Sequence, residues 1–391
     1  MRILFIADGR SQIALNWMRY FVESEHEVHL VSLYPGEPDL EFDSFTYIPV
    51  AFSGAVEQGS KGAGGSGSLL KKLATPQVRT WLRHHFIPRS LPAAASQLQS
   101  LISNLQPDLI HAMRIPYEGM LAAVALSLTP DAPSPPLLIS VWGNDFTLHA
   151  PATRRLTKLT RQTMKFADAL HTDCVRDLGL AGEWGFSNEK PGVVLPGAGG
   201  IQKEIFFPNE EAIEKIVINP RGMRAYVQNE TFFKAIPLIL ESQPNVQFIC
   251  PAMQNQPEAV VWVSRLGAGK SLQLLPHLTR IQMAEAFRRS QIVLSITTHD
   301  GTPNTLLEAL ACGCFPIVGN IESLREWITH GENGLLVDPK DPKGLADAIL
   351  RALQDDALRV RAREQNLKLI AERAEYSKVM GDAEEFYQGL I

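Results

Sequence analysis

Short apolar runs alternate with amphipathic stretches along most of the chain. The apolar run "RILFIA" (2–7) is followed by "IALNWMRYFVE" (13–23), which has helical periodicity, and then by the apolar run "EVHLVSL" (27–33). A strand, a helix and a second strand within about 30 residues are typical of a βαβ unit in a parallel sheet. Further strands are predicted at 46–51, 109–113, 137–142, 169–173 and 192–197. Helical stretches such as 92–105 separate most of them, which predicts a doubly wound α/β domain.

The same alternation restarts in the second half of the chain. Strands are predicted at 214–220, 246–252, 272–276, 292–296, 315–319 and 334–337. The segment 196–209 between the two sets is Gly-rich and aperiodic, which makes it the best domain boundary. We therefore expect one α/β domain at 1–197 and another at 198–370. Two such domains joined by a short hinge would face each other across a cleft at the carboxyl ends of their strands, where open α/β sheets bind ligands.

Composition narrows the class of protein. The chain has 391 residues, of which 45% are hydrophobic and 20% charged, as in soluble globular proteins. A net charge of -5 argues against a general nucleic-acid binder, which needs a basic surface. Four scattered cysteines do not form a disulfide framework, and the first apolar run is too short for a signal peptide. No apolar run reaches the length of a membrane span, so we expect a cytoplasmic protein.

Two segments of the first half allow two interpretations each. The Gly/Ser-rich segment 57–68 is either a flexible loop facing the cleft or a tolerated surface insertion. The segment 71–89 carries basic residues beside apolar ones. A basic amphipathic helix there can bind an anionic membrane surface, which would place the protein peripherally at the inner membrane face, but an ordinary surface helix has the same pattern.

Two motifs suggest chemistry that their context does not support. "GAGKS" (267–271) lacks the first glycine of a P-loop, and the predicted order around it is helix before strand. "CGC" (312–314) has no second cysteine pair, whereas zinc sites need four ligands. Cys312 and Cys314 are better interpreted as small buried side chains. We expect no metal site and no bound cofactor.

Polar residues follow three of the predicted strands. Gly9 and Arg10 come after the first strand, where a glycine lets backbone N–H groups approach phosphate but also serves close packing. Asp145 follows another strand, and it is either a catalytic carboxylate or a helix cap. Arg221 and Arg224 follow the first strand of the second set, where their guanidinium groups suit phosphate oxygens or a surface salt bridge.

The sharpest feature is "THDGTPNTLLEALACG" (298–313), a strand end followed by a turn and a helix. The helix is predicted to start near Asn304 or Thr305, whose side chains can cap it. Its first N–H groups and its dipole form an anion site. Asp300 and Glu308 flank this site, and carboxylates accept hydrogen bonds from sugar hydroxyls. The pattern therefore indicates a nucleotide-sugar, with its phosphates at the helix start and its hydroxyls on the two acids.

The stretch "DGTPNTLLEALACGCFPIV" (300–318) resembles the GT-B retaining glycosyltransferases, in particular glycosyltransferase family 4. The following stretch "EWITHGENGLLVDPKDPKGLADAI" (326–349) is also similar to that family. "LIHAM" (109–113) and "VWGND" (141–145) resemble strands of its N-terminal domain. The resemblance covers the whole chain and is strongest over 290–350. It implies two Rossmann-like domains, an acceptor-binding one and a nucleotide-sugar-binding one, and a final helix at 371–391 that crosses back to the first domain.

The resemblance also implies roles for individual residues. Asp300 and Glu308 keep the spacing of the family's two acids, which bind the donor sugar and the ribose. Pro303 has no N–H group, so the following residues, Asn304 and Thr305, are expected to make more of the contacts with sugar and phosphate. Asp145 is implied to orient or deprotonate the acceptor, with His111 as the lesser candidate. The donor is implied to be bound by Arg221, Arg224, His277, Leu278, Asp300, Gly301, Thr302, Asn304, Thr305 and Glu308.

These observations lead to one hypothesis with two alternatives. We expect a metal-independent retaining glycosyltransferase that moves a hexose, with glucose favoured, from a UDP-sugar to a saccharide or lipid-linked acceptor. One alternative is a GT-B epimerase acting on a nucleotide-sugar, and the other is a non-catalytic nucleotide-sugar-binding protein. Asp300 is one methylene shorter than the glutamate usual in the family, so the identity of the donor sugar stays open.

Overall fold

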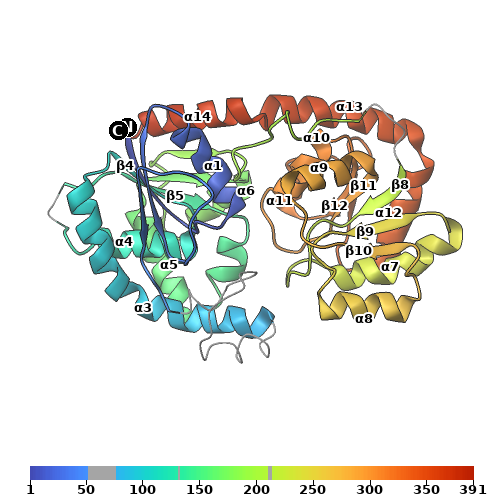
Figure 1. The fold of residues 1–391 in the computed structure, drawn as a ribbon, viewed down its shortest axis with the longest axis horizontal. Coiled ribbons are helices and arrows are strands. Elements are labelled where there is room, and N and C mark those ends of the chain that lie inside the picture. Colours follow the sequence, from blue (N-terminus) through green and yellow to red (C-terminus); the bar gives the residue numbers. More distant parts are fainter. Residues whose placement is uncertain (52–75, 131–132, 210–213) are drawn as a thin grey trace. The chain divides into compact units, whose positions relative to one another are not determined.

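The computed structural model of the protein describes residues 1–51, 76–130, 133–209 and 214–391. The chain divides into two compact units, one formed by Met1–Gly199 with Met380–Ile391 and the other by Gly200–Val379. Each unit is built on a parallel sheet with helices packed around it (Figure 1). The prediction of an α/β protein with two Rossmann-like sheets is therefore confirmed. The Gly/Ser-rich segment 57–68 lies outside the described residues.

The first unit contains a seven-stranded parallel sheet with the order β3-β2-β1-β4-β5-β6-β7. Its strands are β1 (Arg2–Ala7), β2 (Glu27–Ser32), β3 (Ser44–Tyr47), β4 (Leu109–Ala112), β5 (Leu137–Val141), β6 (Ala169–Thr172) and β7 (Gly192–Val194). The strand order reverses between β1 and β4, and this is the point at which open α/β sheets place their ligands. Strands β1, β4 and β5 are almost entirely apolar and buried, as both faces of the sheet are covered.

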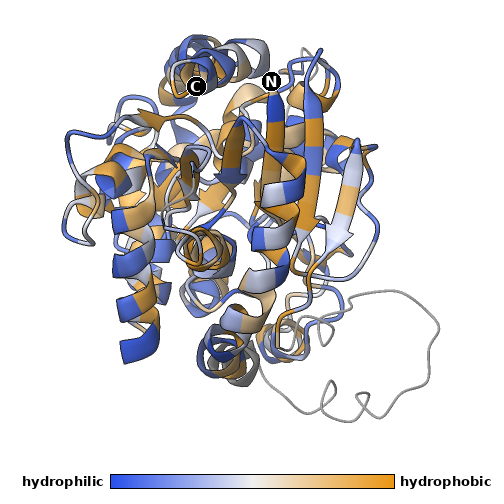
Figure 2. Cartoon of the chain, turned by 90° about the vertical axis from the view of Figure 1, so that its left-hand side faces the viewer, coloured by the Kyte–Doolittle hydropathy of each residue, from blue (hydrophilic) through white to orange (hydrophobic). Residues whose placement is uncertain are grey.

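The connections between these strands are mostly helical. They are α1 (Gln12–Val22), α3 (Pro76–Leu105), α4 (Met120–Leu126), α5 (Arg154–Phe166) and α6 (Val175–Ala181), with the π-helical turns η2 (Ile115–Gly119) and η3 (Asp145–His149). The C-terminal helix α14 (Tyr376–Gln388) contributes its later residues to this unit. Figure 2 shows that apolar residues dominate the strands, whereas the helices carry apolar and polar faces.

The second unit repeats this plan with a six-stranded parallel sheet of order β10-β9-β8-β11-β12-β13. Its strands are β8 (Glu214–Ile218), β9 (Gln247–Cys250), β10 (Leu272–Leu274), β11 (Ser290–Ser295), β12 (Phe315–Gly319) and β13 (Leu335–Val337). Its helices are α7 (Asn229–Ser242), α8 (Pro257–Leu266), α9 (Arg280–Arg289), α10 (Asn304–Ala311), α11 (Glu322–Arg325), α12 (Pro342–Gln354) and α13 (Asp356–Arg373). The order reverses between β8 and β11, the counterpart of β1 and β4.

Successive residues of the strands in the second sheet enter two different hydrophobic clusters. Ile292 and Leu294 join the cluster that includes α7 and α12, whereas Val293 between them joins the cluster that includes α9 and α10. This follows from the two-residue side-chain period of a strand. Both faces of the sheet are thus buried, and β11 is held rigidly enough to position the residues that follow it.

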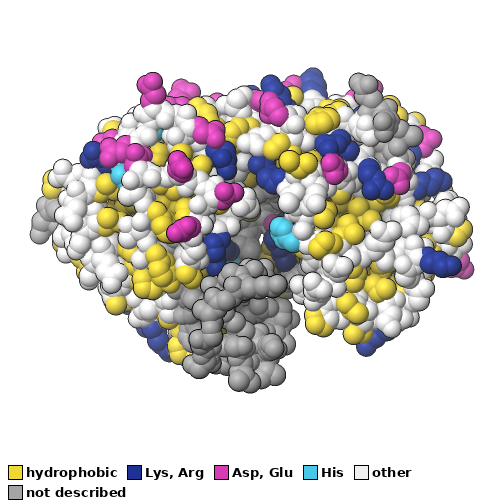
Figure 3. All heavy atoms as spheres, viewed as in Figure 1, with side chains coloured by type: hydrophobic (Ala, Val, Ile, Leu, Met, Phe, Trp, Pro, Cys, Tyr) yellow, Lys and Arg dark blue, Asp and Glu magenta, His cyan; other side chains and the backbone are white. Residues whose placement is uncertain are grey.

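Two predicted elements differ from the structure. The strand predicted at 46–51 is β3 at Ser44–Tyr47, paired with β2 at the sheet edge. The stretch predicted as a helix at 71–89 is described only from Pro76 onward, and there it forms one helix, α3, with the stretch predicted at 92–105; this helix continues through Pro88 and Pro92. Among the described residues, no helix is both long and apolar enough to cross a membrane. On the face in Figure 3, the described Lys and Arg side chains are interspersed with Asp and Glu.

Candidate functional site

The carboxyl edge of the second sheet gathers three of the predicted donor-binding residues. Arg221 follows β8, Asp300 follows β11, and Thr305 lies in the first turn of α10. The buried Arg221 guanidinium forms an ion pair with Asp300, and its Nη1 donates to Thr305 Oγ1 at 3.4 Å. Its Nε is buried without a hydrogen-bond partner among the described residues. The ion pair therefore fixes the direction of a guanidinium at the point where the strand order reverses.

The start of α10 lies beside this ion pair. Pro303 is the N-cap residue, with φ -69° and ψ 121°, and no side chain accepts a hydrogen bond from the helix start. The prediction that Asn304 or Thr305 caps the helix is wrong, because these residues already lie inside it. Proline fixes φ at this value and offers no side-chain acceptor. The Leu306 N–H already donates to the Pro303 carbonyl at 2.9 Å, so the N–H groups at the helix start that can bind an external anion are those of Asn304 and Thr305.

Glu308 lies one turn further along α10. Its side chain is half-buried, and the structure gives its carboxylate no hydrogen-bond or ion-pair partner among the described residues. Burial raises the pKa of Glu308 to about 7, against the opposing effect of Arg280. A partly buried carboxyl group without a partner is costly to keep in a folded protein. Its position is explained if a ligand supplies the missing hydrogen bonds.

The remaining predicted donor residues lie less directly at this point. The buried Thr302 Oγ1 accepts a hydrogen bond from Trp327 Nε1 at 2.8 Å, so its hydroxyl group is already engaged in the protein interior. Arg224 is exposed and donates to Tyr226 Oη at 3.0 Å. Its charge nevertheless acts on Asp300. The roles assigned to these residues stay predictions.

Three further predicted positions can be located by their elements. Gly301 is buried in the turn between Asp300 and the helix. His277 is exposed and Leu278 is half-buried in the loop that joins β10 to α9. Their contacts with sugar, phosphate and base stay predictions.

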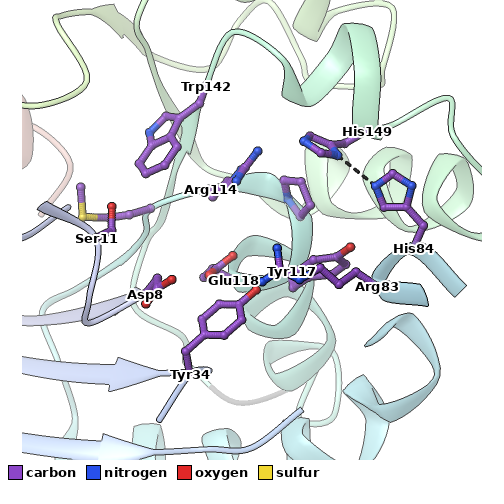
Figure 4. Close-up of a pocket in the computed structure, with 12 residues that line it drawn as sticks. Asp8, Ser11, Tyr34, Arg83, His84, Arg114, Tyr117, Glu118, Trp142 and His149 are labelled. Carbon is purple, nitrogen blue, oxygen red and sulfur yellow. Dashed lines mark hydrogen bonds between the residues drawn. The ribbon is translucent and has the colours of Figure 1, made fainter. Parts of the chain in front are cut away.

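The carboxyl edge of the first sheet encloses a cavity of about 210 Å³ (Figure 4). Residues after β1, β2, β4 and β5 line it together with residues of α3 and η3. Figure 4 shows Asp8, Tyr34, Arg114 and Glu118 turned towards the same space. The cavity lies at the reversal of strand order between β1 and β4, so it corresponds in its own unit to the site of Arg221 and Asp300.

Asp145 lies beside this cavity but is fully engaged by the protein. Its carboxylate accepts from Arg114 Nε at 3.0 Å and from the backbone N–H groups of Trp142 at 3.1 Å and Ile115 at 3.4 Å. Arg114 also donates to Asn144 Oδ1 at 3.0 Å. Asp145 therefore orients Arg114, whose side chain lines the cavity. Because these hydrogen bonds already occupy its carboxylate, the geometry does not favour the catalytic role of Asp145, which stays a prediction.

Glu118 lines the cavity and is 4% exposed. Its carboxyl group interacts with its own backbone N–H, but its Oε2 has no hydrogen-bond partner among the described residues. Burial raises the pKa of Glu118 to about 8. The preceding Tyr117 has φ 90°, which is strained for a residue with a side chain. Strained backbone of this kind concentrates at ligand-binding sites, because the surrounding structure must hold it in place.

Two histidines close another side of the cavity. His84 Nε2 and His149 Nδ1 are 3.0 Å apart, which is the dashed line in Figure 4. Burial lowers the pKa of His84, and burial with the nearby Arg114 charge lowers that of His149 to about 2. Both rings are therefore neutral at physiological pH, and one donates its proton to the other.

His111, the second predicted catalytic residue, belongs to a closed hydrogen-bond chain in the first unit. His171 Nε2 must donate to the Leu195 carbonyl at 2.9 Å, so its Nδ1 accepts from Ser140 Oγ at 2.8 Å. Ser140 Oγ then accepts from His111 Nε2 at 2.7 Å, and His111 Nδ1 accepts from Tyr387 Oη. His111 is 0% exposed, and burial lowers its pKa. Both ring nitrogens are occupied, which disfavours proton transfer to a substrate.

The predicted phosphate loop after β1 is likewise engaged. The Gly9 N–H donates to Ser32 Oγ at 3.2 Å, and Arg10 forms an ion pair with Asp8 at 2.9 Å. The Arg10 guanidinium also lies over the Tyr34 ring, 4.7 Å from its centroid. The contact of Gly9 and Arg10 with phosphate stays a prediction.

The cysteines of "CGC" are buried, as predicted. Cys314 Sγ donates to the Phe287 carbonyl at 3.1 Å, and Cys312 belongs to the same hydrophobic cluster. Elsewhere, ligand atoms of Asp173, Cys174 and Asp177 lie within 4.8 Å of one another. There the Cys174 thiol donates to Asp177, and Arg176 neutralises that acid.

Three residues of the cavity lining, Arg83, Arg114 and Glu118, were not predicted from the sequence. A signal was present for two of them. Arg114 and Glu118 are charged residues in an otherwise apolar stretch directly after the strand "LIHA", which is where a parallel sheet presents ligand-binding residues. Arg83 had no such signal, because it lies on a long helix far from any strand end.

Comparison with known protein families finds two matches that together cover most of the chain. Residues 201–369 match the family of glycosyl transferases group 1, and residues 8–197 match the glycosyl transferase 4-like domain. A D-inositol 3-phosphate glycosyltransferase of Corynebacterium glutamicum is 26% identical over 192 residues, which are 44% of this chain and 45% of that protein. The chain spans less than half the length of the first curated relatives it matches.

Solved structures share the fold at low sequence identity. Sucrose-phosphate synthase from Thermosynechococcus elongatus has a TM-score of 0.77 and 15% identity, with 100% of this chain and 99% of that chain covered. HepE from Anabaena in complex with UDP-glucose has a TM-score of 0.73 and 13% identity, with 100% of both chains covered. The predicted GT-B fold is thereby confirmed.

Proposed function

We propose that the chain, whose residues 201–369 match the glycosyl transferases group 1 family and whose residues 8–197 match the glycosyl transferase 4-like domain, is a retaining glycosyltransferase. It moves a hexose, with glucose favoured, from a UDP-sugar to a saccharide or lipid-linked acceptor, and it does so without a metal ion. The family supports a glycosyltransferase. The complexes of HepE with UDP and with UDP-glucose support the choice of nucleotide and sugar.

One observation carries the donor half of this proposal. Arg221 is held by Asp300 beside the start of α10, which no side chain caps. Glu308 lies one turn away, and its carboxylate has no hydrogen-bond or ion-pair partner among the described residues. A guanidinium and free helix N–H groups bind phosphate oxygens, whereas a carboxylate binds hydroxyl groups. A nucleotide-sugar presents both kinds of group at this spacing. We assign the diphosphate to Arg221 and α10, and a ribose hydroxyl to Glu308.

The same groups account for the chemical step. When the acceptor oxygen bonds to the anomeric carbon, the bond from that carbon to the diphosphate oxygen breaks, and its electron pair leaves with UDP. The developing negative charge falls on the diphosphate, which faces Arg221 and the helix start. Donors and dipoles that are already oriented towards this charge stabilise the transition state without reorganising. The acceptor hydroxyl gives its proton in the same step to an oxygen of the departing diphosphate, which carries the electron pair of the broken bond.

A UDP-release assay with UDP-glucose and a panel of acceptors tests the proposal. We expect Glu308→Ala to lower kcat/KM by at least tenfold, since it removes a hydrogen bond to the donor. Glu285→Ala, which removes an exposed carboxylate from the neighbouring helix α9, is the matched control and should leave activity unchanged. Equal activity in the two variants would sink the assignment of Glu308.

Two finer parts of the proposal need their own measurements. Proton NMR of the first product formed shows whether the anomeric configuration of the donor is retained. Competition among UDP-, GDP- and ADP-sugars shows whether uracil is the preferred base.

Peripheral membrane contact through 71–89 is tested by sedimentation with anionic vesicles. UDP binding without any transfer would favour the non-catalytic alternative.

A further inference from the structure

The cavity of the first unit is small and well defined. Its volume of about 210 Å³ is below the roughly 300–1,000 Å³ of sites for drug-sized ligands. The cavity is also partly open to solvent. That space accommodates a single sugar or cyclitol ring.

Glu118 indicates that this ligand brings hydroxyl groups. Its carboxyl group lines the cavity, is 4% exposed, and has an oxygen with no partner among the described residues. Buried polar groups in native proteins are nearly always hydrogen-bonded, so an orphaned one at a cavity wall marks a place for a ligand atom. A carboxyl oxygen accepts from a hydroxyl, and Tyr34 and Tyr117 add phenol groups that donate and accept.

The charges around the cavity do not cancel. Asp8 is neutralised by Arg10, and Arg114 is neutralised by Asp145. The two histidines are neutral, because burial lowers the pKa of both. Glu118, whose pKa burial raises to about 8, is mostly uncharged at pH 7. The lining therefore depends on one further group for its net charge.

That group is Arg83. It lines the cavity from α3, and among the described residues its guanidinium contacts no carboxylate. The guanidinium carbon of Arg83 lies over the face of the Tyr34 ring, 5.7 Å from the ring centroid. An arginine offers five N–H donors in a planar fork that matches phosphate and carboxylate oxygens. A lining with one surplus positive charge favours an anionic ligand.

We propose that this cavity is the acceptor site and that it takes a ring-sized polyhydroxyl compound bearing one anionic group, a phosphate or a carboxylate. Arg83 binds the anion and Glu118 binds a ring hydroxyl. Arg114, whose charge Asp145 neutralises, adds N–H donors beside the ring. This inference rests on the proposed glycosyltransferase function, and it narrows the acceptor from any saccharide to a sugar or cyclitol with an acidic substituent.

Isothermal titration calorimetry on the full chain tests the inference with four probes. They are glucose 6-phosphate, glucuronate, glucose and inorganic phosphate, and UDP is titrated separately. We expect either acidic sugar to bind at least tenfold more tightly than glucose and than phosphate alone. If only one acidic sugar does so, that result identifies the anion as phosphate or carboxylate.

Three variants separate the roles of the two residues. Arg83→Gln should reduce the affinity for the acidic sugars to that for glucose, and Glu118→Gln should weaken all three sugars by a similar factor. Arg89→Gln, an exposed position on the same helix that does not line the cavity, is the matched control and should behave as wild type. UDP affinity, which belongs to the second unit, should be unchanged in all three and reports that the variants are folded.

The outcomes distinguish this inference from the function on which it rests. Equal affinity for glucose and the acidic sugars, or an Arg83→Gln variant that keeps the preference, overturns the anionic acceptor and leaves the donor assignment standing. No binding of any sugar probe by a wild-type protein that binds UDP overturns the acceptor cavity. Wild-type protein that fails to bind UDP refutes the proposed function instead.

Discussion

Replacing Glu308 by glutamine should raise the free energy of unfolding above that of wild type at alkaline pH. Burial raises the folded-state pKa of Glu308 from 4.5 to about 7. Between these values the folded state keeps a proton that the unfolded state has lost, so the free energy of unfolding falls as pH rises. Above pH 7 the carboxylate is charged in both states, and the cost of burying it is fully present. Glutamine has the same shape and carries no charge to bury.

The size of the effect follows from the same two values. A difference of about 2.5 between 4.5 and about 7, at about 1.4 kcal/mol for each pKa unit, gives an upper bound of about 3 kcal/mol. Because the side chain is only half-buried, we expect about 1–3 kcal/mol after solvent screening. The gain of Glu308→Gln over wild type should therefore grow by this amount from pH 4.5 to pH 8.

Urea denaturation at several pH values, followed by circular dichroism, measures this growth. Taking the difference between variant and wild type at each pH removes the contribution of every other titrating group. Glu285→Gln, an exposed position on the adjacent helix, makes the same change in charge and should show no growth. A constant difference between Glu308→Gln and wild type across this range would refute the reasoning that burial controls this carboxyl group.

Three further outcomes follow from the described contacts. Arg221→Met leaves the Asp300 carboxylate without its main cation, and we expect a loss of up to about 3 kcal/mol of stability together with weaker UDP binding in titration calorimetry. Tyr387→Phe removes the hydroxyl that accepts from Trp17 Nε1 and donates to His111, so the thermal midpoint should drop by the equivalent of about 2 kcal/mol, measured by calorimetry. EDTA should leave the rate of UDP release unchanged, and loss of activity restored by Mg²⁺ or Mn²⁺ would contradict the metal-independent mechanism.

The fold could be predicted because its signal is local and repeated. Each buried strand of a parallel sheet is an apolar run, and each helix between strands has its own period. The errors arose where a local rule competes with packing. Proline is expected to end a helix, yet α3 continues through Pro88 and Pro92 because its apolar face packs on α4. The edge strand β3 alternates half-buried and exposed residues, so its position was displaced towards the apolar residues that follow it.

The donor residues could be predicted because most of them lie in one short segment. Asp300, Thr305 and Glu308 belong to a single strand end, turn and helix, and the sequence shows their spacing directly. The cavity of the first unit is assembled from six separate elements, so no local pattern reveals it. For the same reason the surroundings of His111 could not be predicted, because its ring is hydrogen-bonded by Tyr387, which lies 276 positions further along the chain.

The two units have the same arrangement of charged residues at the reversal of strand order. At each reversal of strand order an aspartate orients an arginine: Asp300 holds Arg221, and Asp145 holds Arg114. Among the described residues, a carboxyl group with unsatisfied oxygens lies close to each ion pair: the half-buried Glu308 in one unit, and the buried Glu118, through its Oε2, in the other. Burial raises the pKa of Glu308 to about 7 and that of Glu118 to about 8. An ion pair is satisfied within the protein and needs no ligand, so it serves to position the arginine. A buried carboxyl group without a partner lowers the stability of the empty fold. Since the fold keeps one in each unit, we infer that ligand hydroxyl groups complete both, and that these two glutamates, rather than the paired aspartates, mark where the substrates lie.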